Sequence, residues 1–242
     1  MLELSAKDIR QLEDLNISVE QVERQVNQFK TGFPFSDLVA PATIGNGIIN
    51  FSDTEVQELI KQFDEDKQYY DILKFIPASG AASRMFKNVY SFVEEFKGKE
   101  IPEDFLKKEN VKADSIENFF LSIREFAFYD DLKNKLAEHN KDIDTLLSEN
   151  RLVEIAEFLL ENEGLGYGKL PKALLKFHKY KEVSRYALEE HLVEAAHYST
   201  AETDEGVVAQ LHFTVSQEHL DIFKKVVEEV LPHYEEMFNI KY

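Results

Sequence analysis

The amino-acid sequence predicts a mixed α/β fold, and three observations lead to that class. A short apolar run over residues 72–76 stops at Pro77, and a tight loop and a helical pattern follow it, which is the order strand, loop, helix. Residues 207–215 alternate between apolar and other side chains, which is typical of a strand with one buried face. Most of the remaining chain carries apolar residues at spacings of three and four, which predicts amphipathic helices.

Residues 1–70 are expected to form a helical N-terminal region. Ser52 and Glu55 have the spacing of a capping box, in which each side chain bonds the backbone N–H of the other residue at a helix start. The preceding segment, residues 32–51, is rich in glycine and proline and reads as an ordered loop. The helix that follows the capping box has an apolar face made of Val56, Leu59, Ile60 and Phe63.

Residues 71–242 are expected to form the α/β region. Ile72–Ile76 reads as a buried central strand that ends because Pro77 has no N–H to donate to a ladder. A helix is expected from Ala82 onward, and a helical insert at about residues 98–163. Further helices are expected over residues 184–199 and after Ser216, the latter passing through Pro232 because apolar residues continue to Phe238. Residues 239–242 read as the beginning of a strand, so we expect the chain to be a truncated part of a longer protein.

Composition excludes several classes of function. The chain has 46 acidic and 28 basic side chains and a formal charge of −18, so its mean field repels nucleic acids and anionic membranes, although a local group of cations could still hold one small anion. It has no cysteine, which excludes disulfides and thiolate metal sites. No secretory signal and no apolar run of about 20 residues is visible, so we expect a soluble cytoplasmic protein.

The first candidate motif is the segment FIPASGAASRMFK, residues 75–87. Small residues after a strand and before a helix leave backbone N–H groups free for an anion, and glycine allows close approach. A guanidinium fork suits phosphate oxygens. The alternative is a tight turn whose small residues merely pack while Arg84 pairs with a carboxylate. The candidate residues are Ala78, Ser79, Gly80, Ala81, Ala82, Ser83, Arg84 and Lys87.

The second motif is GYGKLPKALLKFHKY, residues 166–180, where lysines gather in an otherwise acidic chain. Lys172 is the candidate, because Pro171 fixes the backbone before it and the preceding glycines would allow a sharp approach to a pocket. The alternative is a basic surface strand, which we favour for Lys179 and Lys181. No histidine or carboxylate spacing here indicates a metal site, and His178 and His191 are expected to be structural.

Together the motifs resemble those of sugar-phosphate nucleotidyltransferases. The segment Ala78–Met85 matches a loop of the form A-x-G-x-x-[ST]-R-[ML], and Leu170-Pro171-Lys172 looks like the Pro-Lys element of that family. Glu190-His191 stands where those enzymes often begin a helix. The whole chain looks closer still to the N-terminal half of the domain-of-unknown-function 4301 family, whose members carry segments like PASGAASRMFK and LPK-x-LLxFH.

The resemblance implies a GT-A-like fold, a three-layer sheet that is incomplete here and carries the large helical insertion. It implies catalytic roles for Arg84 and Lys172, nucleotide contacts from residues 78–83 and Lys87, and Mg²⁺ between the phosphates. A nucleotide or sugar nucleotide would be the ligand, and a nucleotidyl group would pass to a sugar phosphate. The sequence departs from the pattern of that family in two ways. A helical insert replaces a short loop, and no convincing metal-binding Asp follows residues 207–215. The alternatives are another phosphoryl-transfer enzyme and a non-catalytic binding module on the same fold.

Overall fold

A computed structural model describes residues 3–107, 111–181, 183–204 and 206–242. They form a mixed α/β protein with small open sheets, divided into two compact units at residues 59 and 60. None of the described helices is long and apolar enough to cross a membrane.

The unit that ends at Leu59 consists of short elements that bury no described side chain. Its first helix starts at a capping box in which Ser5 and Asp8 bond each other's backbone N–H. The capping box expected at Ser52 and Glu55 is confirmed, with the Ser52 N–H donating to the Glu55 carboxylate at 2.7 Å. The elements are α1 (Ala6–Asp14), α2 (Val19–Thr31), β1 (Thr43–Ile44), β2 (Gly47–Ile48) and α3 (Asp53–Asp66), which crosses into the next unit.

The main sheet of the second unit is built on β7 (Gly206–Thr214), as the alternating pattern predicts. The strand β3 (Leu73–Pro77) pairs with β7 in parallel, in a register that runs from Leu73 opposite Gln210 to Pro77 opposite Thr214. The strand β6 (Thr200–Thr203) pairs with it antiparallel. At the end of the chain, Lys241 exchanges two backbone hydrogen bonds with β7, to Val207 and Ala209.

The expectation of a buried central strand at residues 72–76 is wrong. Among the described residues β3 pairs only with β7, and Leu73 and Phe75 stay 54% and 60% exposed. The inward positions are Lys74 and Ile76, and Lys74 is neutralised by Glu194. A five-residue apolar run does not reveal which of its faces is covered, and here only one is.

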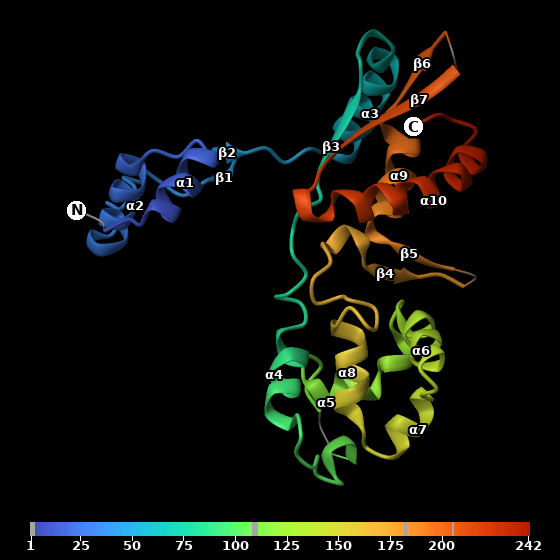
Figure 1. Cartoon of the computed structure of the whole chain (residues 1–242). Coiled ribbons are helices and arrows are strands. Elements are labelled where there is room, and N and C mark those ends of the chain that lie inside the picture. Colours follow the sequence, from blue (N-terminus) through green and yellow to red (C-terminus); the bar gives the residue numbers. More distant parts are fainter. Residues whose placement is uncertain (1–2, 108–110, 182, 205) are drawn as a thin grey trace. The chain divides into compact units, whose positions relative to one another are not determined.

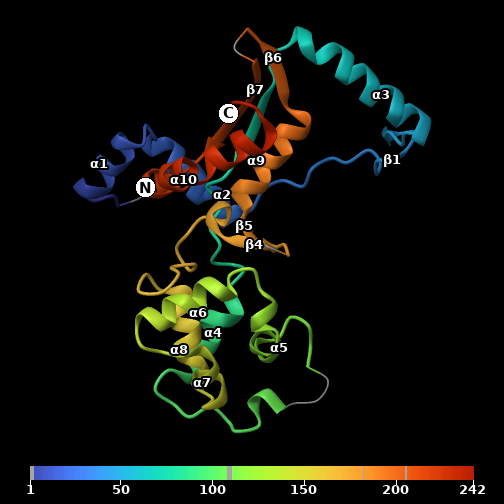
Figure 2. The same ribbon diagram turned by 90° about the vertical axis from the view of Figure 1, so that its right-hand side faces the viewer.

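Most of the core lies in a group of helices that follows the first motif. The central helix is α8 (Leu152–Leu160), which packs against α4 (Lys87–Phe96), α6 (Tyr129–Glu138) and α7 (Ile143–Ser148), as Figures 1 and 2 both show. The helix α5 (Ile116–Leu121) packs on α4. Contacts between aromatic rings, such as that of Phe92 with Phe120 at 5.1 Å, fill the space between these helices.

A second core lies between α9 (Ala187–Tyr198) and α10 (Leu220–Phe238), which continues through Pro232 as expected. The helix expected from Ser184 begins three residues later, because residues 184–186 form β5 (Ser184–Tyr186) against β4 (Lys176–Lys179). The remaining elements are single 3₁₀ turns: η1 (Lys67–Tyr69), η2 (Phe105–Lys107), η3 (Ile123–Glu125), η4 (Lys172–Leu174) and η5 (Gln217–His219).

Candidate functional site

The loop after β3 is fixed at its two ends and exposed between them. At its start the Ala78 N–H donates to the carbonyl of Thr214 at 2.9 Å, which extends the pairing with β7 by one residue. Near its end Ala82 is fully buried, and its carbonyl accepts the N–H of Met85 at 2.8 Å. Ser79, Gly80 and Ala81 lie exposed between these two anchors, and Ser83 and Arg84 are exposed after them.

The structure places the second motif directly against this loop. The Lys172 N–H donates to the carbonyl of Gly80 at 2.9 Å, and Ala81 forms an antiparallel bridge with Pro171. Pro171 is buried at this junction, whereas Lys172 is exposed. Two cationic segments about 90 residues apart in sequence therefore meet through their backbones, at the end of β3.

The helix after the loop starts later than expected. Residues 83–86 form turns, and α4 begins at Lys87 with Phe86 as an N-cap that supplies no side-chain hydrogen bond. Small, buried Ala82 fits against the helical core, but nothing at that position caps a helix. The first turn of α4 therefore presents its free N–H groups about five residues beyond Ala82.

The three candidate cations have no partner in the part of the chain that the structure describes. Arg84, Lys87 and Lys172 are exposed, and none forms an ion pair or a side-chain hydrogen bond with a described residue. Two other lysines of the second motif are bonded, since Lys176 pairs with Asp131 at 2.7 Å and Lys179 donates to a carbonyl at 3.0 Å. The carboxylate that the alternative interpretation of Arg84 requires is thus not among the described residues.

The glycines of the two motifs differ in whether the fold leaves room for a side chain at their positions. A Cβ atom added at Gly168 would lie 1.9 Å from the Tyr90 hydroxyl, and one at Gly164 would lie 1.7 Å from the Phe158 carbonyl oxygen. These two glycines therefore let the loop pack closely on α8 and Tyr90, and this packing accounts for them without a ligand. A Cβ atom at Gly80 would meet no heavy atom within 4 Å, and Gly80 has no positive φ angle that would demand glycine.

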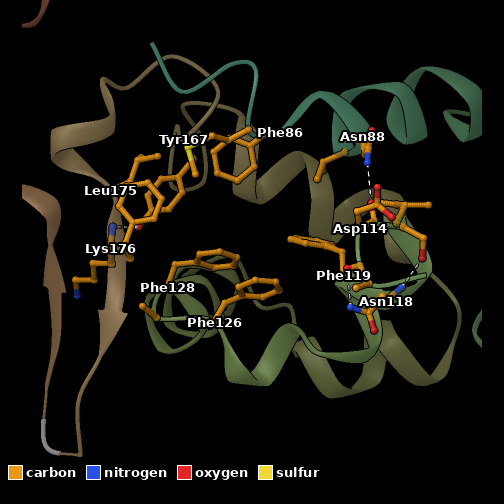
Figure 3. A pocket seen from close by; sticks show the side chains of 17 residues that line it. Phe86, Asn88, Asp114, Asn118, Phe119, Phe126, Phe128, Tyr167, Leu175 and Lys176 are labelled. Carbon is orange, nitrogen blue, oxygen red and sulfur yellow. Dashed lines mark hydrogen bonds between the residues drawn. The ribbon is translucent and has the colours of Figure 1, made fainter. Parts of the chain in front are cut away.

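Sequence reasoning missed a cavity of about 290 Å³ that begins next to the loop. Figure 3 shows aromatic rings around it, with Phe86 on one side and Phe126 and Phe128 on the opposite side. Arg84 and Lys172 do not line the cavity. The sequence indicated such a site through its high phenylalanine content. The lining residues are spread over about 90 positions, however, and come together only in the folded chain. The lining residues are Met85, Phe86, Asn88, Val89, Ala113–Asn118 except Glu117, Phe119, Phe126–Phe128, Tyr167 and Leu175–Phe177.

One tyrosine connects the cavity to the second motif. Tyr167 is buried, contacts the rings of Phe86 and Phe128, and its hydroxyl oxygen accepts the N–H of Lys176 at 3.3 Å. Burial raises the pKa of the Tyr167 hydroxyl well above its usual value, so it stays neutral at physiological pH. This contact holds the start of β4 against the cavity.

The described residues lack a cluster of metal-binding side chains. They contain no group of three or more histidine, aspartate or glutamate side chains that could hold an ion. The magnesium implied by the nucleotidyltransferase resemblance stays a prediction, because Mg²⁺ at nucleotide sites is usually held by one or two carboxylates together with substrate phosphates.

Comparison with known proteins gives one match. No curated protein and no solved structure matches the chain. The model of one protein family, described as a domain of unknown function (DUF4301), matches residues 5–242. Because that match covers nearly the whole chain, the protein belongs to the DUF4301 family.

Proposed function

We propose that this chain binds the phosphate groups of a nucleotide at residues 78–84, as the nucleotide-binding part of a nucleotidyltransferase-like protein. The observation that carries the proposal is the hydrogen bond from the Lys172 N–H to the Gly80 carbonyl. It joins an exposed loop of small residues to a second segment, and each segment carries an exposed cation without a described partner. A negatively charged ligand would supply the missing partner for both.

The chemistry of the loop suits phosphate better than other anions. Gly80 leaves open space above the backbone, so phosphate oxygens can approach the exposed main chain closely. The hydroxyls of Ser79 and Ser83 are exposed donors on either side of it. Arg84 adds the planar fork that binds phosphate through two parallel hydrogen bonds, and Lys172 adds a point charge.

The reaction we propose for the complete site is attack by a sugar phosphate, or a related acceptor, on the α-phosphorus, with pyrophosphate as the leaving group. In it Arg84 and Lys172 would offset the charge that builds up on phosphoryl oxygens. The described residues contain no group of three or more metal-binding side chains, and no step of this proposal is assigned to a metal. Another phosphoryl-transfer reaction and simple nucleotide binding use the same contacts, and turnover assays distinguish them.

The test is calorimetric titration of the protein with inorganic triphosphate and with nucleoside triphosphates. Arg84→Ala and Lys172→Ala should each weaken triphosphate binding about tenfold or more, because each removes a charge-assisted contact. Lys99→Ala is the matched control, since Lys99 is an exposed lysine beyond the opposite end of α4, about 15 Å away by helix length. Equal affinities for all three variants would refute the proposed anion site.

Thermal unfolding of the same variants separates binding from folding. Both substitutions replace exposed side chains without described partners, so the midpoint of thermal unfolding should stay near that of the wild type. Release of pyrophosphate in the presence of a sugar phosphate would support the transferase reaction, and binding without turnover would support the binding module.

A further inference from the structure

We propose that the aromatic cavity next to the loop binds the purine ring of the nucleotide, and that it selects a base carrying an exocyclic amino group. This inference rests on the proposed function for the position of the phosphates. The walls and the volume of the cavity support a ring site independently of the phosphates.

The two segments that carry the candidate cations also build the cavity. Met85 and Phe86 follow Arg84 directly, and both line the cavity. The lining residues Leu175–Phe177 follow Lys172 by three to five positions. A ligand whose phosphates lie at residues 78–84 therefore has walls of the cavity within a few residues of its binding loop, because consecutive Cα atoms are about 3.8 Å apart.

The walls suit a flat ring. Ring contacts run around the cavity from Phe86 through Tyr167, Phe128 and Phe126 to Phe119, with centroid separations of 5.1 to 6.0 Å. The rings of Phe126 and Phe128 are nearly parallel, with an interplanar angle of 7°. Such rings offer flat faces on which a nucleobase can stack, whichever base it is.

The volume fits a two-ring system. The cavity of about 290 Å³ is close to twice the size of an engineered cavity of about 150 Å³ that holds benzene. It lies at the lower end of the range of about 300–1,000 Å³ for small-molecule sites, which suits a part of a nucleotide better than the whole. A purine in the cavity with ribose and phosphates outside it is the arrangement that this size permits.

One end of the cavity is polar and offers acceptors. Asn88 donates its side-chain N–H to the carbonyl of Asp114 at 2.9 Å, and Asn118 donates its own to the carbonyl of Ala113 at 3.0 Å. With the amide nitrogens used in this way, the amide oxygens of both asparagines remain as acceptors, and no described residue donates to them. Figure 3 shows this end opposite Tyr167 and Leu175, so a ring lying between the aromatic walls would meet it with its edge. An exocyclic amino group would donate a hydrogen bond to these oxygens.

The test compares ligands that differ in one feature each, by calorimetric titration of the full chain. At least one of ATP and GTP should bind about tenfold tighter than inorganic triphosphate, and tighter than inosine triphosphate, which lacks the amino group. Phe177→Ala removes a wall residue that is 39% exposed, and should weaken binding of that nucleotide about tenfold while leaving triphosphate binding unchanged. Phe75→Ala is the matched control, because Phe75 is an exposed phenylalanine that does not line the cavity.

A second variant tests the amino group. Asn88→Ala removes one acceptor, and should reduce the preference over inosine triphosphate while leaving binding of inosine triphosphate itself nearly unchanged. If the nucleotides bind no tighter than triphosphate, or if Phe177→Ala behaves like Phe75→Ala, the ring site is wrong while the phosphate site stands. Adenosine or guanosine binding that depends on Phe177, with no binding of triphosphate, would support the ring site and refute the phosphate site.

Discussion

The loop after β3 and the loop before η4 look alike in sequence and differ in what their small residues do. Both combine glycine with a nearby cation, residues 78–86 in the first loop and residues 164–172 in the second. In the second loop, Gly164 and Gly168 sit where a side chain would collide with α8 or with Tyr90. In the first loop, Gly80 has open space where its side chain would be.

The difference teaches how to tell a structural glycine from a candidate binding glycine. A glycine that contacts its own fold is explained by packing, and no ligand is needed to account for it. A glycine with open space and no positive φ angle is not explained by packing, which makes it a candidate for close approach of a ligand. The predictions below separate these two cases, beginning with the largest expected effect on stability.

Gly164→Ala should destabilise the protein by about 3 kcal/mol. The added Cβ atom would lie 1.7 Å from the Phe158 carbonyl oxygen, a backbone atom that cannot swing away. The same oxygen accepts the Leu165 N–H at 2.7 Å, so moving the loop also loses that bond. Urea unfolding followed by circular dichroism measures the change, and a shift below about 0.5 kcal/mol would contradict the packing explanation.

Gly168→Ala should also destabilise the protein, but by less than Gly164→Ala. Its Cβ atom would meet the Tyr90 hydroxyl at 1.9 Å, and a side-chain tip can move more easily than a backbone carbonyl. We therefore expect a smaller loss than at Gly164, and a partial recovery when Tyr90→Phe is added. No recovery would mean that the Leu160 carbonyl oxygen, 2.9 Å from the same position, sets the cost instead.

Alkaline pH should weaken the second loop through Tyr167. Burial raises the pKa of Tyr167 above the ordinary value of about 10, so above pH 10 the unfolded chain releases a proton that the folded chain retains. The contribution to stability is fully present below pH 10 and is lost as the pH rises, by about 1 kcal/mol at pH 11. The free energy of unfolding should decrease less with rising pH in Tyr167→Phe than in the control Tyr69→Phe, since Tyr69 is 75% exposed.

Gly80→Ala should have the smallest effect on stability and the clearest effect on binding. The open space at Gly80 accepts a methyl group, so the free energy of unfolding should stay within about 0.5 kcal/mol of the wild-type value. Binding of inorganic triphosphate should weaken several-fold, because the methyl group would occupy the space proposed for a phosphate oxygen. Urea unfolding and calorimetric titration give the two values, and unchanged binding would place the anion elsewhere.

Local patterns in the sequence predicted those features that depend on local physics. The capping box at Ser52, the alternating strand β7 and the passage of α10 through Pro232 are all as expected. The errors occurred where a neighbour decides the outcome, as in the exposed face of β3 and in β5, which replaces the expected start of α9. The spacing of apolar residues can be read within one segment of the sequence. The residues that pack on a face of that segment come from distant parts of the chain.

The sequence by itself determined the mixed α/β class, the helical stripes and the two segments worth attention, because periodicity, proline and glycine act over a few residues. Only the tertiary structure decided that Lys172 meets Gly80, because that contact joins positions about 90 residues apart. The tertiary structure also decided which glycines are packed against other atoms and which have open space beside them. Steric contact depends on the atoms that surround a glycine, and these belong to other parts of the chain. The aromatic cavity is also a product of the fold, because its rings come from five separate segments that hydrophobic packing brings to one place.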